Sequence, residues 1–223
     1  MTNSRGLTKE QTIAFYDRFG AKQDRQAYYE DIALVELVRW GRFEEATRVV
    51  EFGCGTGRFA ERLLADHLPP QATYWGCDVS MTMLKLTEQR LLPFGGRVEI
   101  WKSDGEGQLP LPDASTDRFV SNYVLDILSF DEIHFTIAEA GRILTPGGLL
   151  CLVSLTNGAQ GFSKLASALW KIAYALKPSL VGGCRPIELQ LLLVGVDWEV
   201  LHCQVVVGRG ISSEVIVAQN RRG

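Results

Sequence analysis

Three glycines at alternate positions separate a short apolar run from a helix-like pattern in the stretch VVEFGCGTGRFAERLL, residues 49–64. Gly53, Gly55 and Gly57 each give up a side chain, at a cost of roughly 0.5–1 kcal/mol in ordered structure. Where a helix begins, such a loop lets backbone N–H groups approach a ligand. A simple tight turn would also use glycines, so the interpretation as a binding loop needs support from other residues.

Acidic residues stand where three successive strand-like runs end. Glu51 comes just before the glycines, Asp78 ends the next run, and Asp104 follows the run after that. In an open sheet of alternating strands and helices, ligands bind outside the carboxyl ends of the strands. Asp78 is placed to accept both hydroxyls of a ribose, and Asp104 to accept the exocyclic amine of adenine. Each acid alone could be a cap or turn residue, but together they predict a nucleoside site.

The loop and its preceding acid favour a cationic ligand. A dinucleotide carries a pyrophosphate and is bound by G-x-G-x-x-G loops, whereas this loop reads G-x-G-x-G after Glu51. Acidic surroundings suit S-adenosylmethionine, which has a sulfonium and an ammonium against one carboxylate. Arg58 is the exception, and we interpret it as an exposed residue of a first helical turn. A nucleotide-dependent dehydrogenase and a non-catalytic cofactor-binding module remain alternatives.

The elements that must position these residues alternate along the chain. Helical patterns at 9–19, 24–42, 58–66, 80–92 and 131–144 are interspersed with strand-like runs at 48–52, 73–78, 97–103, 116–122 and 149–155. This alternation predicts a parallel sheet covered by helices.

The end of the chain differs from this pattern. After a helical stretch at 162–176, two strand-like runs at 198–208 and 213–219 are joined by a turn alone. So short a link excludes a parallel crossover, and the two runs should therefore pair antiparallel. We expect about seven strands with a terminal hairpin.

Composition sets the class of protein. The chain has 223 residues and a formal charge of −3, which predicts one domain and no bulk affinity for nucleic acid. No signal peptide and no uninterrupted apolar run long enough to span a membrane is visible. The 5 cysteines form no CxxC or Cys/His cluster, so we expect no metal site. We expect a reduced, cytoplasmic protein without disulfides.

At this point the sequence resembles class I S-adenosylmethionine-dependent methyltransferases, nearest to the type-11 and ubiquinone/menaquinone-biosynthesis-like groups. VVEFGCGTGRF resembles the first family motif, GCDVSMTMLKLTEQR the second, and SDGEGQLPLPDASTDRFVSNYVLDIL the third and fourth. AGRILTPGGLLCLVS resembles the helix–turn–strand that closes the pattern. The resemblance covers about 47–155 and implies a doubly wound α/β fold. Its mostly parallel seven-stranded sheet would have the order 3-2-1-4-5-7-6, with helices on both faces and an antiparallel C-terminal hairpin.

The resemblance also implies a division of this single methyltransferase domain. Residues 1–46 would form an N-terminal helical lid, 47–155 the cofactor-binding core, 156–197 a substrate-side insertion and 198–223 the terminal hairpin.

Positions for the cofactor, S-adenosylmethionine, follow from the resemblance residue by residue. Its methionine end would be surrounded by Glu51, Gly53, Thr56 and Gly57. Asp78 would hold the ribose and Val79 would pack on adenine, while Asp104 and the backbone of Gly105 would bind the adenine edge. Asn122 would contact the methionine moiety or the substrate.

The implied reaction is an in-line displacement at the sulfonium methyl, for which the protein mainly supplies orientation and excludes water. Tyr16 and Tyr123 are candidates for reaching the methyl group, with amphipathic aromatics at a core edge as the alternative. Asp126 is interpreted as a helix-terminal carboxylate, and no general base can be named without the acceptor.

The segment 161–183 is mostly apolar, and its polar residues form a narrow stripe of Lys164, Ser167 and Lys171. It could cover the sheet, form a wall over a hydrophobic acceptor, or lie on a membrane surface with its lysines facing headgroups. We expect a small, apolar or lipid-like acceptor and no nucleic acid; peripheral membrane contact and the oligomeric state stay open.

Overall fold

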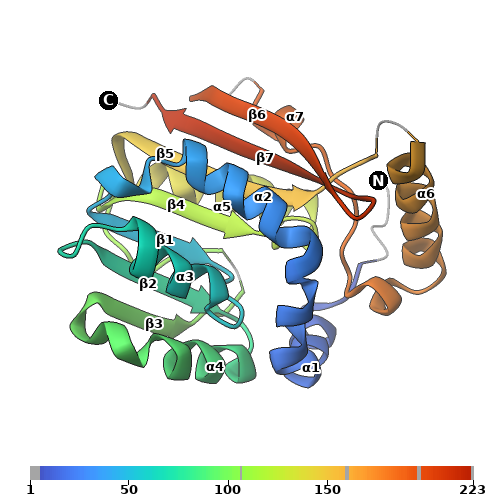
Figure 1. Ribbon diagram of the computed structural model, residues 1–223, viewed down its shortest axis with the longest axis horizontal. Coiled ribbons are helices and arrows are strands. Elements are labelled where there is room, and N and C mark those ends of the chain that lie inside the picture. Colours follow the sequence, from blue (N-terminus) through green and yellow to red (C-terminus); the bar gives the residue numbers. More distant parts are fainter. Residues whose placement is uncertain (1–5, 106, 159–160, 195–196, 222–223) are drawn as a thin grey trace.

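A single seven-stranded sheet forms the centre of the computed structural model, which describes residues 6–105, 107–158, 161–194 and 197–221. The strands are β1 (Arg48–Phe52), β2 (Thr73–Asp78), β3 (Val98–Lys102), β4 (Thr116–Asn122), β5 (Leu144–Leu155), β6 (Trp198–Gly208) and β7 (Ile211–Asn220). Their order is β3-β2-β1-β4-β5-β7-β6, in which the first five strands pair in parallel and β7 pairs antiparallel with β5 and β6. The predicted fold, strand order and terminal hairpin are confirmed (Figure 1).

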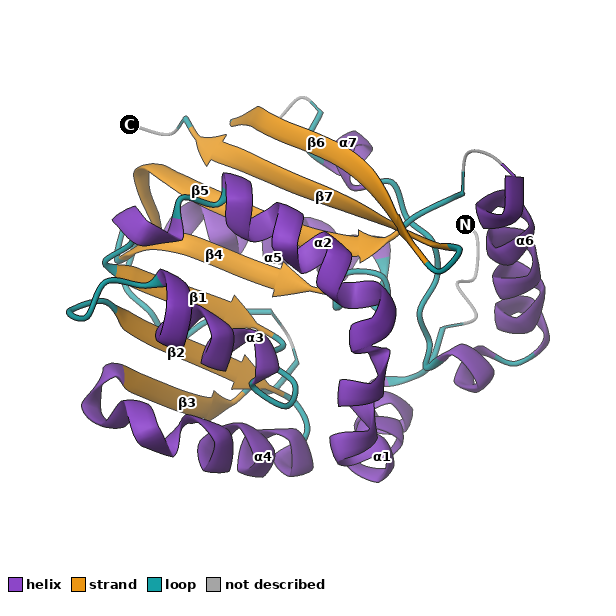
Figure 2. Cartoon of the chain, viewed as in Figure 1, coloured by secondary structure: helices purple, strands orange, loops and turns teal. Residues whose placement is uncertain are grey.

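Helices lie on both faces of this sheet (Figure 2). They are α1 (Lys9–Phe19), α2 (Ala27–Trp40), α3 (Arg58–Arg62), α4 (Met81–Leu91), α5 (Phe130–Ile143), α6 (Gly161–Leu176) and α7 (Leu189–Leu192), with shorter helical turns η1 (Gly20–Gln26), η2 (Phe43–Glu45), η3 (Leu63–His67), η4 (Leu92–Arg97) and η5 (Pro178–Val181). Within the described residues, none of these helices combines the length and the apolar character needed to cross a membrane.

The two faces of the sheet carry separate apolar cores. In β7, Val215 and Val217 pack with α2 and α3, whereas Ile216 and Ala218 pack with α5 and α7. Successive side chains of a strand point to opposite faces, so a strand covered on both sides must be apolar at every position. This is why 149–153 in β5 and 215–218 in β7 are continuous apolar runs.

Side-chain caps explain where several helices begin. Ser80 is the N-cap of α4, as predicted, and its Oγ accepts a hydrogen bond of 3.1 Å from the backbone N–H of Met83. Ser129 and Glu132 form a capping box that begins α5 at Phe130. β5 begins at Leu144, earlier than the sequence pattern predicts, because Leu144 already pairs with Thr116 before the register shifts.

Helix α6 stands apart from both faces of the sheet, beyond the carboxyl ends of the parallel strands (Figure 1). It packs on η5 and on part of β7. The structure therefore does not support the interpretation of 161–176 as a cover for the sheet. The division of the chain into lid, core, insertion and hairpin stays a prediction.

We predict that Gly208→Ala destabilises the protein by about 1–3 kcal/mol, because an added Cβ would lie 2.7 Å from the backbone oxygen of Tyr29 in α2. Gly96→Ala is the matched control, since nothing lies within 4 Å of a Cβ there. Its free energy of unfolding should change by less than about 0.5 kcal/mol. Chemical denaturation of the two variants measures both values, and equal values would show that α2 is not packed tightly on β6.

Candidate functional site

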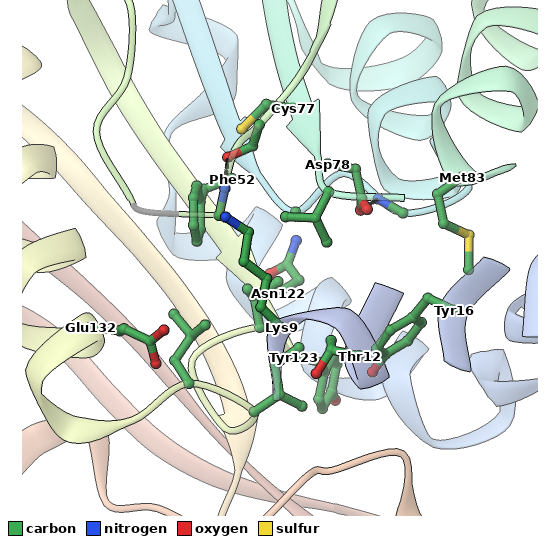
Figure 3. Close-up of a pocket in the computed structure, with 18 of the residues that line it drawn as sticks. Lys9, Thr12, Tyr16, Phe52, Cys77, Asp78, Met83, Asn122, Tyr123 and Glu132 are labelled. Carbon is green, nitrogen blue, oxygen red and sulfur yellow. Dashed lines mark hydrogen bonds between the residues drawn. The ribbon is translucent and has the colours of Figure 1, made fainter. Parts of the chain in front are cut away.

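A cavity of about 910 Å³, its open mouth included, lies where β1, β2 and β4 end. Its wall combines the loops that follow these strands with residues of α1 and η1. Figure 3 shows Asp78 and Asn122 facing the same space, with Tyr16 and Thr12 of α1 across from them. The cavity lies at the topological switch point of the sheet, where β1 has β2 on one side and β4 on the other.

The glycine loop is folded in a way that only glycine tolerates. Gly53, Gly55 and Gly57 have φ values of 79°, 56° and 75°, in the left-handed region that costs other residues energy. A Cβ on Gly53 would lie 2.3 Å from Val124 Cγ2. Gly53 and Gly55 line the cavity, so the loop brings bare backbone to its wall, as predicted.

Asp78 ties this loop to the end of β2. Its Oδ2 accepts a hydrogen bond of 3.0 Å from the N–H of Gly55, and its Oδ1 accepts one of 2.8 Å from the N–H of Ser80. Burial raises the pKa of the Asp78 carboxyl, and the backbone hydrogen bonds oppose this rise. The N–H of Val79 contributes a further backbone hydrogen bond to this carboxylate, whose two oxygens offer about four acceptor positions, so one is left for a ligand hydroxyl.

Beyond Asp78, the wall is formed by Val79 and Gly105, which both line the cavity. Their contacts with adenine stay predictions. The N–H of Gly105 donates a hydrogen bond of 3.0 Å to Ser103 Oγ. Lys9 of α1 lies over this part of the wall, since a Cβ on Gly105 would come within 3.1 Å of Lys9 Cε. Asp104 is exposed and is not among the lining residues. Its charge acts on Cys77, which does line the cavity, and its contact with the adenine edge stays a prediction.

Behind the wall, Glu51 is buried and orients Asn122. Its carboxylate accepts a hydrogen bond of 2.6 Å from the hydroxyl of Tyr74 and one of 3.2 Å from Asn122 Nδ2. Burial raises the Glu51 pKa to about 7. Asn122 lines the cavity, and its Oδ1 is buried without a hydrogen-bond partner among the described residues. Asn122 thus separates Glu51 from the cavity. Because Glu51 binds the Nδ2 of Asn122, the Oδ1 of Asn122 points away from Glu51.

Thr56 and Gly57 support the loop from its outer side. Thr56 Oγ1 donates a hydrogen bond of 2.6 Å to Asp24 of η1, and Gly57 packs against Thr87 of α4. Neither residue is among those that line the cavity.

Ion pairs hold the segment formed by α1, η1 and α2, here called the N-terminal segment, against the glycine loop. Arg90 of α4 pairs with Asp24 at 2.6 Å, and Arg58 pairs with Glu30 at 2.9 Å and also with Asp31. Arg58 lies in the first turn of α3, as predicted, but the prediction that it is exposed is wrong, because it is half-buried and ion-paired. Its pairing could not be seen in the sequence because its partners precede it by about one helix and one strand.

Gln23 is a site residue that the sequence analysis missed. Its side chain covers Gly55, since an added Cβ there would lie 2.9 Å from Gln23 Oε1. Gln23 lines the cavity, and this Oε1 is buried without a hydrogen-bond partner in the part of the chain that is described. No motif marks a lone glutamine in a polar helical turn.

Tyr16 and Tyr123 both reach the cavity. Burial raises the pKa of both hydroxyls, which favours their neutral form. The Tyr123 hydroxyl is 2.8 Å from Ser213 Oγ, and its backbone has a left-handed φ of 57°. Such strain in a non-glycine residue is typical of functional sites.

Asp126 is not the helix-terminal carboxylate that the sequence suggests. It lies fully buried in the loop between β4 and α5, where Oδ2 accepts a hydrogen bond of 3.2 Å from the N–H of Leu155. Burial raises its pKa to about 7. It is not among the residues that line the cavity.

Comparison with known proteins finds methyltransferases. The sequence model of a family described as a methyltransferase domain matches residues 49–148, the part that holds the glycine loop, Asp78 and Asn122. This stretch is similar to methyltransferase domains, in agreement with the resemblance to class I, S-adenosylmethionine-dependent methyltransferases. The type-11-like grouping is consistent with this match. The dehydrogenase alternative has no support from it.

Two curated relatives differ in what they methylate. The malonyl-[acyl-carrier protein] O-methyltransferase of Hahella chejuensis is 30% identical over 69% of this chain and 56% of its own length. The tRNA N(3)-cytidine methyltransferase METTL2 of Danio rerio is 32% identical over 47% of this chain and 31% of its own length. The chain thus spans about a third to a half of the length of these relatives.

Solved structures share the fold across nearly the whole chain. The N-methyltransferase NodS of Bradyrhizobium japonicum, in complex with S-adenosyl-L-homocysteine, superposes with a TM-score of 0.71 at 17% identity, covering 95% of this chain and 99% of NodS. The [4+2]-cyclase SpnF superposes with a TM-score of 0.74 at 17% identity, covering 98% of this chain and 98% of SpnF. Both likenesses concern the fold alone.

We predict that Glu51→Gln weakens binding of S-adenosylhomocysteine by about tenfold, the value of one lost hydrogen bond to a charged group. A glutamine at position 51 has one acceptor oxygen instead of two, and the hydroxyl of Tyr74 occupies it. The other side-chain atom is then an NH₂ group, which donates to Asn122. We therefore expect the Asn122 amide to turn, so that its Oδ1 no longer faces the cavity. Calorimetry measures the affinity, and thermal unfolding shows whether the variant is folded.

A double-mutant cycle separates this orienting role from the loss of charge. In an Asn122→Ala background, Glu51→Gln should cost less than about threefold in affinity. An undiminished tenfold cost in that background would contradict the orienting role of Glu51.

Proposed function

We propose that this protein binds S-adenosylmethionine in the cavity at the ends of β1, β2 and β4 and transfers its methyl group to a small, apolar or lipid-like acceptor. The observation that carries the proposal is that Gly53, Asp78, Val79, Gly105 and Asn122 line one cavity. They come from four separate stretches of the chain, and the matched family model spans all of them.

The residues present fit this cofactor. Gly53 and Gly55 leave backbone where a side chain would clash, and Asp78 offers a lone pair for a ribose hydroxyl. The unpartnered oxygens of Gln23 and Asn122 are acceptors suited to an ammonium group. Lys9 is the cationic exception in the lining; because its side chain is exposed, it can turn towards solvent when a cation enters.

When bound, the cofactor supplies an electrophilic methyl group on a sulfonium. The chain's own residues orient the partners and exclude water, effects worth up to about 7–11 kcal/mol of the barrier. The N-terminal segment acts as the lid, because its ion pairs with Arg58 and Arg90 hold it at the mouth. Tyr16, which stays neutral, positions the acceptor by donating a hydrogen bond.

The lining of the cavity supports a small apolar acceptor. Leu7, Val124, Ile127 and Leu128 are apolar residues that line the cavity. The malonyl-[acyl-carrier protein] relative is named for a small acceptor group, whereas the METTL2 relative is named for tRNA. A formal charge of −3 disfavours a polynucleotide, which is bound mainly through its phosphates by lysine and arginine. We therefore retain the small acceptor.

We predict that Asp78→Ala lowers the affinity for S-adenosylhomocysteine at least tenfold, as expected for hydrogen bonds to a charged group worth about 1.5–3 kcal/mol. Glu99→Ala is the matched control, because Glu99 is an exposed acid on the adjacent strand β3. It should bind as the native protein does. Calorimetry checks both values, and failure of the intact protein to bind either cofactor form would overturn the proposal.

We predict that the native protein, incubated with methyl-labelled S-adenosylmethionine and a cell extract, labels a small molecule or lipid that mass spectrometry identifies. Tyr16→Phe should lower the labelling rate about tenfold, for the loss of one hydrogen bond to the acceptor, while leaving cofactor affinity unchanged. Labelled RNA would contradict the proposed acceptor. Cofactor binding without any labelled product would instead favour a non-catalytic cofactor-binding module.

A further inference from the structure

An apolar stripe runs along the outward side of α6 and η5. Leu165, Leu169, Ile172 and Leu176 are 56%, 58%, 56% and 78% exposed, and Leu180 of η5 is 65% exposed. Residues spaced by three and four positions share one face of a helix. The stripe is therefore a continuous apolar surface, of a kind that monomeric soluble proteins rarely leave open unless something binds there.

The other side of α6 attaches the helix to the protein. Trp170 Nε1 donates a hydrogen bond of 2.9 Å to the backbone oxygen of Cys184, and Ser163 is buried. The Tyr174 hydroxyl lies 3.6 Å from where a Cβ on Gly6 would be. Because these residues face the protein, the leucine stripe is turned outward by the fold itself.

The charge of this region is opposite to that of the whole chain. Between residues 158 and 187 the sequence has no acidic residue and carries Lys164, Lys171, Lys177 and Arg185, although the chain as a whole has a formal charge of −3. Lys164 and Lys171 are exposed and lie two turns apart beside the stripe. An apolar stripe flanked by lysines is typical of helices that lie in a membrane interface.

We propose that the outward face of α6 and η5 binds the surface of a membrane that contains anionic lipids. Leu165, Leu169, Ile172 and Leu176 enter the boundary between headgroups and acyl chains, and the lysines meet lipid phosphates. A second copy of this chain is the less suitable occupant, because docking two such faces would bring like charges together.

This surface is connected to the cavity through one loop. Cys184, which accepts the hydrogen bond from Trp170, has its Sγ 3.9 Å from the hydroxyl of Tyr16. A docked α6 would therefore hold the Tyr16 side of the cavity close to the lipid. Membrane docking does not depend on methyl transfer, and either can fail without the other.

Vesicle co-sedimentation tests the proposal. The native protein should bind vesicles of phosphatidylcholine mixed with phosphatidylglycerol more tightly than vesicles of phosphatidylcholine alone, and added salt should weaken the difference. Leu169→Glu combined with Ile172→Glu should reduce binding at least about tenfold, because charges replace the centre of the stripe. Leu92→Glu is the matched control, since Leu92 is 75% exposed on the distant η4, and it should bind as the native protein does.

Charge reversal provides the second arm. Lys164→Glu combined with Lys171→Glu should weaken binding to the anionic vesicles and leave binding to the neutral ones unchanged.

Absence of vesicle binding by the native protein would overturn the proposal, and so would equal losses in the Leu92→Glu control. A native dimer in light scattering that Leu169→Glu dissociates, without any vesicle binding, would assign the face to a second copy. S-adenosylhomocysteine affinity, measured on every variant, shows that the fold and the cofactor site are intact.

Discussion

The carboxylate of Asp78 holds together the two loops that make the cavity. One of its oxygens accepts the N–H of Gly55 and the other accepts the N–H of Ser80, so the glycine loop after β1 and the start of α4 after β2 are fixed to the same group. The left-handed glycines make this possible, because a loop with side chains would meet Val124 and Gln23. The Asp78 carboxylate therefore has two roles: it holds the two loops of the cavity wall together, and it lines the cavity itself.

Charged residues around this wall are paired rather than solvated. Asp24 and Glu30 of the N-terminal segment meet Arg90 and Arg58 of the sheet-covering helices. Ion pairs of this kind, half-buried and spread over several partners, position two parts of a chain more than they stabilise them. Within this segment, Ala33, Leu34 and Leu37 fix α2 in the apolar core. By contrast, α1 has no buried residue, so it lies over the cavity without being part of that core.

The sequence predicted what depends on local pattern. Alternating strands and helices, the antiparallel hairpin and the Ser80 cap follow from spacing within a few residues, and all are confirmed. Motif spacing also brought Gly53, Asp78 and Asn122 to one cavity. What failed depends on contacts between distant segments: the pairing of Arg58, the burial of Asp126 and the cover that Gln23 gives to Gly55. The identity of a residue and of its sequence neighbours does not predict which distant charged residue it will pair with or whether it will line a cavity.

The place of β7 in the sheet has a consequence for biosynthesis. This strand, residues 211–220, fills the space between β5 and β6 and contributes Val215, Ile216 and Val217 to the interior on both sides. Until β7 has left the ribosome, one edge of β5 is unpaired and both apolar cores lack the side chains of β7. The first five strands therefore cannot complete the sheet. The sheet can be completed only after residues 211–220 have been synthesised, and until then the nascent chain depends on whatever covers the unpaired edge of β5.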